Sequence, residues 1–207
     1  MKWSIYSECE KGFFSSWHKC RVYSLHWLLV FLTNIGITAN IVSMVSAFST
    51  VLFVLLIIDS FSSAVFLLIL HIILDGVDGP LATYQKTVSN KGMFVDFSAD
   101  LVGIASTTLG LMIAGYISPV WSVMYLFFYT VTVFFGLMHT VIGIKQPWSF
   151  RPRLWVYGAV IGMFVVEVST GVHIDMIQIF VQGALLIMCV DIIYDFKRLY
   201  HNANNLE

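Results

Sequence analysis

Four aspartates with a regular spacing are the residues of this chain best suited to chemistry. Asp75 and Asp78 end one long apolar run, and Asp96 and Asp100 begin the next. A carboxylate at the centre of a bilayer costs on the order of 2.5 to 3.5 kcal/mol on insertion scales, so four at the edge of the apolar core need a neutralising partner. The nearby sequence offers few positive side chains, namely His71, Lys86 and Lys91. We therefore expect one or two bound divalent cations.

Helical spacing places these aspartates on shared faces. If residues 62–83 are helical, Asp75 and Asp78 lie on one face with two small residues, Gly79 and Ala82. The next apolar run carries a stripe of small or acidic residues that would let another helix approach closely: Gly92, Asp96, Asp100, Gly103, Thr107 and Gly110. Oxygen ligands without a His or Cys cluster favour Mg²⁺ or Mn²⁺ over zinc.

This stretch resembles the signature of the CDP-alcohol phosphotransferase family, D-x2-D-G-x2-A-R-x8-G-x3-D-x3-D. The matching residues are Asp75, Asp78, Gly79, Ala82, Gly92, Asp96 and Asp100. One position departs, because Thr83 stands where the family has arginine. The resemblance implies a membrane transferase that moves a phosphatidyl group from CDP-diacylglycerol to a small hydroxyl acceptor and releases CMP, in phospholipid biosynthesis.

The resemblance also implies roles for individual residues. Two divalent ions, Mg²⁺ or Mn²⁺, would be held by Asp75, Asp78, Asp96 and Asp100, and Asp100 would also be the catalytic base. The CDP-linked donor would contact Asn40, Gly79, Ala82, Thr83, Lys86, Ser89 and Gly92, with Lys86 as the nearest candidate to replace the missing arginine charge. An anionic acceptor would be bound by Lys145, Arg151 and Arg153. These three residues and Lys86 could instead serve only to set membrane topology, as basic residues of cytoplasmic loops do. Relatives of this kind imply a homodimer.

Composition independently predicts an all-α integral membrane protein. The 207-residue chain is 58% hydrophobic and 11% charged, with a mean hydropathy of +0.85, which a soluble domain would not tolerate. Each of six apolar segments is near the roughly 20 residues that span a bilayer core, at about 41–58, 62–83, 93–115, 120–143, 154–172 and 175–196. The few charges form no patch suited to nucleic acid. We therefore expect membrane lipids, and no nucleic acid, as partners.

Three regions follow from this pattern. Residues 1–36 form an N-terminal cytoplasmic segment in which Phe14, Trp17, Leu25, Leu28 and Leu32 recur near helical spacing, which predicts a helix lying in the headgroup plane. An irregular tail is the alternative. Residues 37–200 form the six-helix transmembrane domain, and residues 201–207 are a C-terminal tail.

The basic residues predict the orientation. All eleven Lys and Arg residues fall before the first span, in alternate loops or after the sixth span. By the positive-inside rule, both termini and the aspartate motif face the cytoplasm, in a membrane that we expect to be bacterial or archaeal.

Several residues keep two interpretations at this stage. Asn40 could contact the nucleotide or cap a helix. His71 could support a metal carboxylate, although a hydrogen bond to a neighbouring helix is the commoner role, and the same holds for His139. Asp191 and Asp195 lie near Lys197 and Arg198, which indicates an interfacial ion-pair cluster.

Other classes of function also stay open. The same family includes enzymes that transfer from CDP-choline or CDP-ethanolamine to diacylglycerol, although the short chain favours the CDP-diacylglycerol branch. Thr83 raises the alternative of a catalytically impaired relative. A cation channel or carrier is disfavoured, because the aspartates cluster at one face and residues 109–117 provide no charge to continue an ion path.

Overall fold

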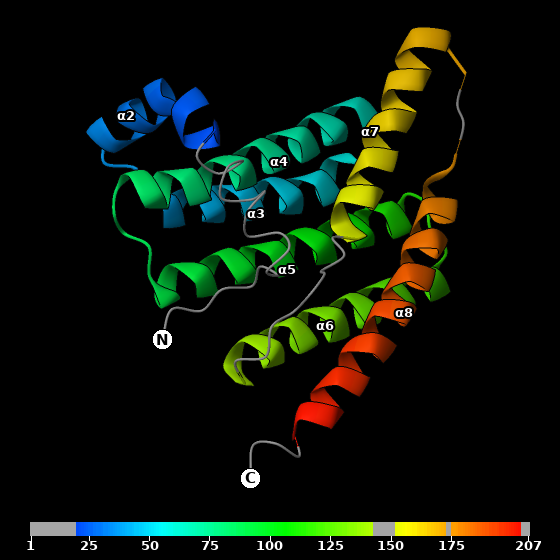
Figure 1. Ribbon diagram of the computed structural model, residues 1–207. Coiled ribbons are helices and arrows are strands. Elements are labelled where there is room, and N and C mark those ends of the chain that lie inside the picture. Colours follow the sequence, from blue (N-terminus) through cyan, green and yellow to red (C-terminus); the bar gives the residue numbers. More distant parts are fainter. Residues whose placement is uncertain (1–19, 143–151, 173–174, 204–207) are drawn as a thin grey trace. The chain divides into compact units, whose positions relative to one another are not determined.

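The computed structural model describes residues 20–142, 152–172 and 175–203. In these ranges every regular element is helical, as Figure 1 shows. The helices are α2 (His26–Asn34), α3 (Ala39–Leu56), α4 (Phe61–Tyr84), α5 (Asn90–Ile113), α6 (Pro119–Ile142), α7 (Pro152–Thr170) and α8 (Ile177–Ala203). A short helical stretch, residues 20–24, precedes α2.

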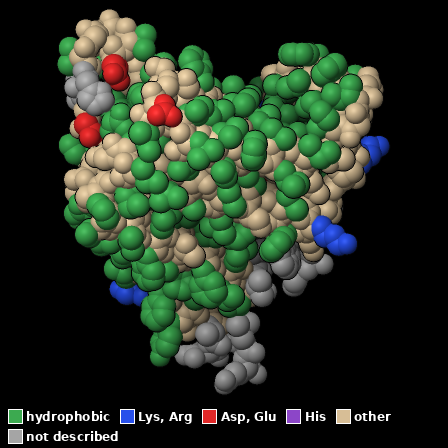
Figure 2. All heavy atoms as spheres, turned by 180° about the vertical axis from the view of Figure 1, so that it is seen from behind, with side chains coloured by type: hydrophobic (Ala, Val, Ile, Leu, Met, Phe, Trp, Pro, Cys, Tyr) green, Lys and Arg blue, Asp and Glu red, His purple; other side chains and the backbone are tan. Residues whose placement is uncertain are grey.

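Six of these helices, α3 to α8, are long and apolar enough to cross a membrane. Their bounds agree with the six predicted segments to within a few residues, apart from the C-terminal end of α8, which extends further. Figure 2 shows a face on which hydrophobic side chains predominate and charged side chains are few. The prediction of an all-α integral membrane protein with six spans is confirmed.

The described chain divides into two compact units, and the boundary between them in the sequence falls between Ala114 and Gly115. In the first unit, α3 packs against both α4 and α5. The small residues of α5 permit this packing: a Cβ added at Gly110 would lie 2.8 Å from a ring carbon of Phe53 in α3. Gly103 and Thr107 are buried on α5 as well. The predicted stripe of small residues is therefore a helix-packing surface.

The N-terminal helix α2 packs against the end of α4 that carries the aspartate motif (Figure 1). Its inner side contributes Leu29 to a buried cluster with Val42 of α3 and with Val77 and Leu81 of α4. Trp27 and Phe31 on its outer side are exposed. This amphipathic pattern is the one predicted for a surface helix. The predicted residues Phe14 and Trp17 lie outside the described residues.

The second unit contains α6, α7 and α8. Helix α8 packs against both α6 and α7. Near the start of α8, the Gln178 side chain accepts a 3.1 Å hydrogen bond from the backbone N–H of Ser118, just before α6. This contact fixes the two helix starts next to each other.

Candidate metal and nucleotide site

Asp75 and Asp78 of α4 and Asp96 of α5 come together in the first unit. One carboxylate oxygen from each lies within 4.8 Å of those from the other two. Asp78 is buried, Asp75 is half-buried and Asp96 is exposed. The cluster therefore extends from the buried space between the packed helices to the protein surface. Three oxygens this close would repel one another if ionised and unbridged, and a hard divalent cation is the ligand that such a donor set suits. The residues present therefore fit a metal centre.

Asp78 is the most firmly held member of the cluster. Ser43 of α3 donates a hydrogen bond of 2.7 Å to Asp78 Oδ2, and the backbone N–H of Gly79 donates one of 2.6 Å to Oδ1. Both carboxylate oxygens are thereby oriented. Ser43 was not predicted from the sequence, although serines recur at every third position there, at Ser43, Ser46 and Ser49, and all three are buried in α3.

Asp100 lies one helical turn beyond Asp96 on α5 and is half-buried. It stands outside the group of three close carboxylates, although it is near enough to Asp78 to interact with it electrostatically. The geometry thus separates a close triad from a fourth carboxylate beside it. That separation suits one group that takes up a proton and three that bind metal.

The start of α5 brings together three residues predicted to bind the nucleotide. Ser89 is the N-cap of α5, and its hydroxyl accepts a 3.1 Å hydrogen bond from the N–H of Gly92. A Cβ at Gly92 would lie 3.5 Å from both the Asn40 carboxamide oxygen and the Ser89 hydroxyl. Asn40 is not the cap of α3, because that position belongs to Thr38. Its carboxamide instead lies beside Gly92 and Ser89.

The remaining donor-site residues of α4 have different surroundings. Gly79 is exposed, and a Cβ there would meet nothing within 4 Å, so space is available beside the aspartates. Thr83 donates its hydroxyl to the backbone carbonyl of Gly79, at 3.0 Å. Ala82 is half-buried and packs against the cluster formed with α2 and α3.

Lys86 has an unusual backbone conformation for its residue type. Its φ of 57° lies in the left-handed region, which glycine usually occupies at the end of a helix. The N–H of Lys86 bonds to the Thr83 carbonyl at 3.2 Å and that of Thr87 to the Ala82 carbonyl at 2.9 Å, which is the hydrogen-bond pattern of a Schellman motif. The exposed Lys86 side chain thus lies at the turn that ends α4, eight residues beyond Asp78.

His71 has the structural role that the sequence analysis preferred. It is buried, and its Nδ1 lies 2.7 Å from the Ser46 hydroxyl of α3. The same hydroxyl is 3.0 Å from the His71 carbonyl oxygen. This pair joins α3 to α4 one turn before Asp75.

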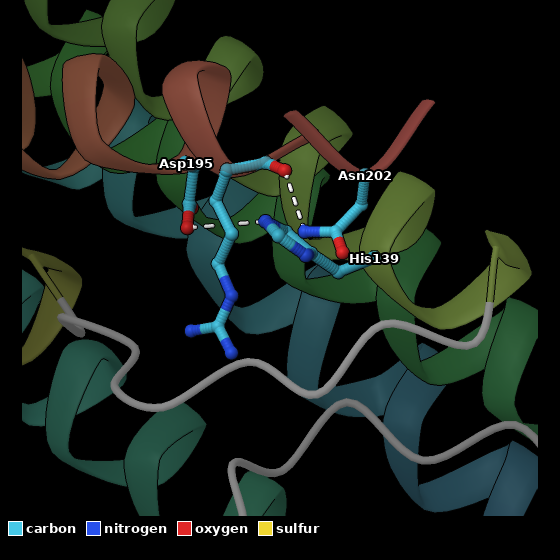
Figure 3. Close-up of polar contacts among 4 residues, drawn as sticks. His139, Asp195 and Asn202 are labelled. Carbon is cyan, nitrogen blue, oxygen red and sulfur yellow. Dashed lines mark hydrogen bonds and ion pairs between the residues drawn. The ribbon is translucent and has the colours of Figure 1, made fainter. Parts of the chain in front are cut away.

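A second polar contact lies in the other unit. His139 of α6 and Asp195 of α8 are buried, and Nε2 lies 3.2 Å from Oδ1 (Figure 3). Two turns beyond Asp195 on α8, the Asn202 side chain donates to the Arg198 carbonyl at 2.8 Å. Asp191 and Asp195 were expected to form an interfacial cluster with Lys197 and Arg198; this is corrected, because both carboxylates are buried and Asp195 pairs with a histidine. His139 joins two helices, as predicted.

The predicted acceptor residues are only partly described. Arg153 lies in the first turn of α7 and is half-buried. Lys145 and Arg151 lie outside the described residues. The acceptor site therefore stays a prediction.

Comparisons with known proteins agree with this geometry. The profile of the family described as CDP-alcohol phosphatidyltransferase matches residues 36–192. A comparison with curated protein sequences finds no significant match. The fold is similar to that of the Mycobacterium tuberculosis phosphatidylinositol phosphate synthase in its apo form, with a TM-score of 0.68 and 13% identity over 84% of this chain and 94% of that one. Because the family profile spans most of the sequence, this chain belongs to the CDP-alcohol phosphatidyltransferase family.

Proposed function

We propose that this protein transfers a phosphatidyl group from CDP-diacylglycerol to a small hydroxyl acceptor and releases CMP. The observation that carries the proposal is the convergence of Asp75, Asp78 and Asp96, at the positions of the family motif, within 4.8 Å on two membrane-spanning helices. A site at the ends of apolar helices suits a donor whose nucleotide is polar and whose acyl chains stay in the bilayer.

The transfer needs few groups. The acceptor oxygen forms a bond to the phosphorus that bears the diacylglycerol, the bond from that phosphorus to the bridging oxygen breaks, and the bridging oxygen leaves with CMP. Asp100 takes the proton of the acceptor hydroxyl, a role that its place beside the close triad supports. When bound at Asp75, Asp78 and Asp96, Mg²⁺ or Mn²⁺ would neutralise diphosphate charge. Ser43 and the Gly79 N–H keep Asp78 oriented for that purpose.

Donor binding is assigned to the start of α5 and the end of α4. Asn40, Ser89 and Gly92 lie together, and the absence of a side chain at Gly92 lets the nucleotide come close. The open space at Gly79 supports a place for the cytidine next to the aspartates. Lys86 supplies the positive charge that Thr83 does not, since a threonine hydroxyl cannot replace an arginine fork at a phosphate.

The acceptor and the setting are part of the same proposal. Arg153, with Lys145 and Arg151, would bind the anionic group of an acceptor such as a phosphorylated alcohol. Both termini and the site face the cytoplasm of a bacterial or archaeal cell, following the distribution of basic residues. The functional unit would be a homodimer, as the family resemblance implies.

Product analysis tests the choice of donor. The full chain, reconstituted in lipid nanodiscs with Mg²⁺ or Mn²⁺, is supplied with CDP-diacylglycerol and a panel of small alcohols, and in parallel with CDP-choline or CDP-ethanolamine and diacylglycerol. We expect CMP only in the first series, together with a new phospholipid that identifies the acceptor. CMP only in the second series would contradict the proposed direction of transfer, and its absence from both would indicate an impaired relative.

A further inference from the structure

A proline lies inside α4 within the aspartate motif. Pro80 follows Gly79 and is buried. Proline has no N–H, so the carbonyl four residues earlier loses its helical hydrogen-bond donor, and the proline ring also crowds that carbonyl. In α4 this carbonyl belongs to Gly76, which lies between Asp75 and Asp78. The turn that carries two of the clustered carboxylates is therefore the turn that Pro80 weakens.

The N-terminal segment supplies a donor to that carbonyl. Arg21 Nη1 donates a partly buried hydrogen bond of 3.2 Å to the Gly76 oxygen, across 55 positions of sequence. Arg21 lies in the helical stretch before α2, and α2 packs on the same end of α4 (Figure 1). A buried carbonyl without a hydrogen-bond donor destabilises the fold, and the Arg21 contact supplies the donor that the Gly76 carbonyl lacks within the helix.

We infer that Arg21 is a positioning residue of the active site, which fixes the turn from Asp75 to Asp78 by replacing the hydrogen bond that Pro80 removes. The inference rests on the proposed function in that this turn would hold the metal. Gly76 has no side chain to anchor it, and Asp75 and Asp78 lie on the same turn, so the positions of their Cα atoms depend on the backbone at Gly76. Arg21 thus sets the position of Asp75 and Asp78 without touching either substrate. Its role couples the N-terminal segment to the metal-binding helix.

A double-mutant cycle with Pro80 tests this coupling. Pro80→Ala restores an N–H at position 80, so the Gly76 carbonyl regains a helical partner and Arg21 becomes dispensable. The four proteins are the wild type, Arg21→Ala, Pro80→Ala and the double variant, each as the full chain in nanodiscs. Two readouts need no turnover: thermal unfolding of the metal-free protein, and the affinity for Mn²⁺ measured by electron paramagnetic resonance.

We expect Arg21→Ala to weaken Mn²⁺ binding roughly tenfold and to lower the unfolding temperature, as the loss of an outer-sphere partner does. In the Pro80→Ala background the same substitution should change Mn²⁺ affinity less than about twofold. Arg21→Lys, which keeps a charged donor, should recover part of the affinity, and Ser24→Ala, at an exposed position of the same segment, should behave as wild type.

Equal losses in both backgrounds would overturn the inference, because Arg21 would then act elsewhere than at the Gly76 carbonyl. No loss in the wild-type background would overturn it as well. If Arg21→Ala does not fold, recovery of folding in the double variant supports the inference, and failure of both overturns it. Release of CMP is measured separately, so a protein that shows the coupling without transfer would contradict the proposed function and leave the role of Arg21 standing.

Discussion

Ser43 of α3 donates a 2.7 Å hydrogen bond to Asp78 of α4, and both side chains are buried. The bond joins two helices that are long and apolar enough to span a membrane, so its loss would remove a donor from a buried carboxylate. It fixes one oxygen of a carboxylate whose other oxygen receives the Gly79 N–H. Helix α3 therefore helps to hold the Asp78 carboxylate of α4 in a fixed orientation.

Removal of this hydroxyl should weaken metal binding with little change in fold. Outer-sphere partners of metal ligands typically contribute about 10- to 100-fold in affinity or activity, so we expect Ser43→Ala to lower Mn²⁺ affinity at least tenfold. Ser49→Ala is the matched control, since Ser49 is also buried in α3 and bonds to its own helix at the Val45 carbonyl. Mn²⁺ titration of both variants compares them, and equal affinities would refute the role of Ser43.

Asp100→Asn should affect turnover more than donor binding. The amide keeps the shape of the side chain and cannot take a proton, so kcat should fall roughly 100-fold or more. Because Asp100 lies outside the close triad, Mn²⁺ affinity should fall less than in Asp96→Asn. Steady-state kinetics and metal titration of the two variants check this order. Near-normal turnover in Asp100→Asn would place the base elsewhere.

Lys86→Gly separates a binding role from a topological one. Glycine relieves a left-handed conformation that costs other residues on the order of 1 kcal/mol, and the greater freedom of the unfolded chain offsets part of this gain. The variant should therefore be as stable as wild type or slightly more stable, and yet bind a CDP-donor analogue more weakly.

Calorimetric titration of the analogue, together with thermal unfolding, tests the Lys86 prediction. Lys86→Arg keeps the charge and is expected to bind nearly as well as wild type. Thr83→Arg, added to Lys86→Gly, should restore part of the affinity by placing an arginine fork one turn beyond Gly79. Unchanged affinity in Lys86→Gly would assign Lys86 to membrane topology alone.

Arg153→Ala should raise the KM for an anionic acceptor and leave donor binding unchanged. A charge-assisted hydrogen bond to a phosphate contributes about 1.5 to 3 kcal/mol, which corresponds to a rise of roughly 10- to 100-fold. Lys197→Ala, another basic residue on the predicted cytoplasmic side, serves as the charge control. Parallel losses for donor and acceptor would indicate a structural role for Arg153 at the start of α7.

The sequence was sufficient for the fold because membrane spans leave a strong signal. Apolar length predicted all six membrane-spanning helices, and the i, i+3 and i, i+4 spacing predicted which carboxylates share a face. The close approach of α5 to α3 at Gly110 was likewise expected from its small residues. These features depend on local periodicity, which can be seen in the amino-acid sequence itself.

Contacts between distant segments were harder to predict. The recurring serines of α3 mark a polar stripe, but neither the Ser43 bond to Asp78 nor the Arg21 bond to Gly76 could be predicted, because each depends on which helix faces which. The pairing of Asp195 with His139 was missed for the same reason: Lys197 and Arg198 are neighbours in sequence, whereas the histidine comes from another helix. The left-handed backbone of Lys86 was also unexpected, since lysine rarely occupies that conformation.

The most direct test of the account is metal-dependent release of CMP from CDP-diacylglycerol. The reconstituted wild-type chain is assayed with Mg²⁺ or Mn²⁺, then in excess EDTA, beside Asp78→Asn and Asp96→Asn. The account predicts CMP with the metal, loss of CMP in EDTA, recovery when metal is added back, and little turnover in either variant. Full turnover in EDTA, or in the two variants, would contradict a metal centre at Asp75, Asp78 and Asp96.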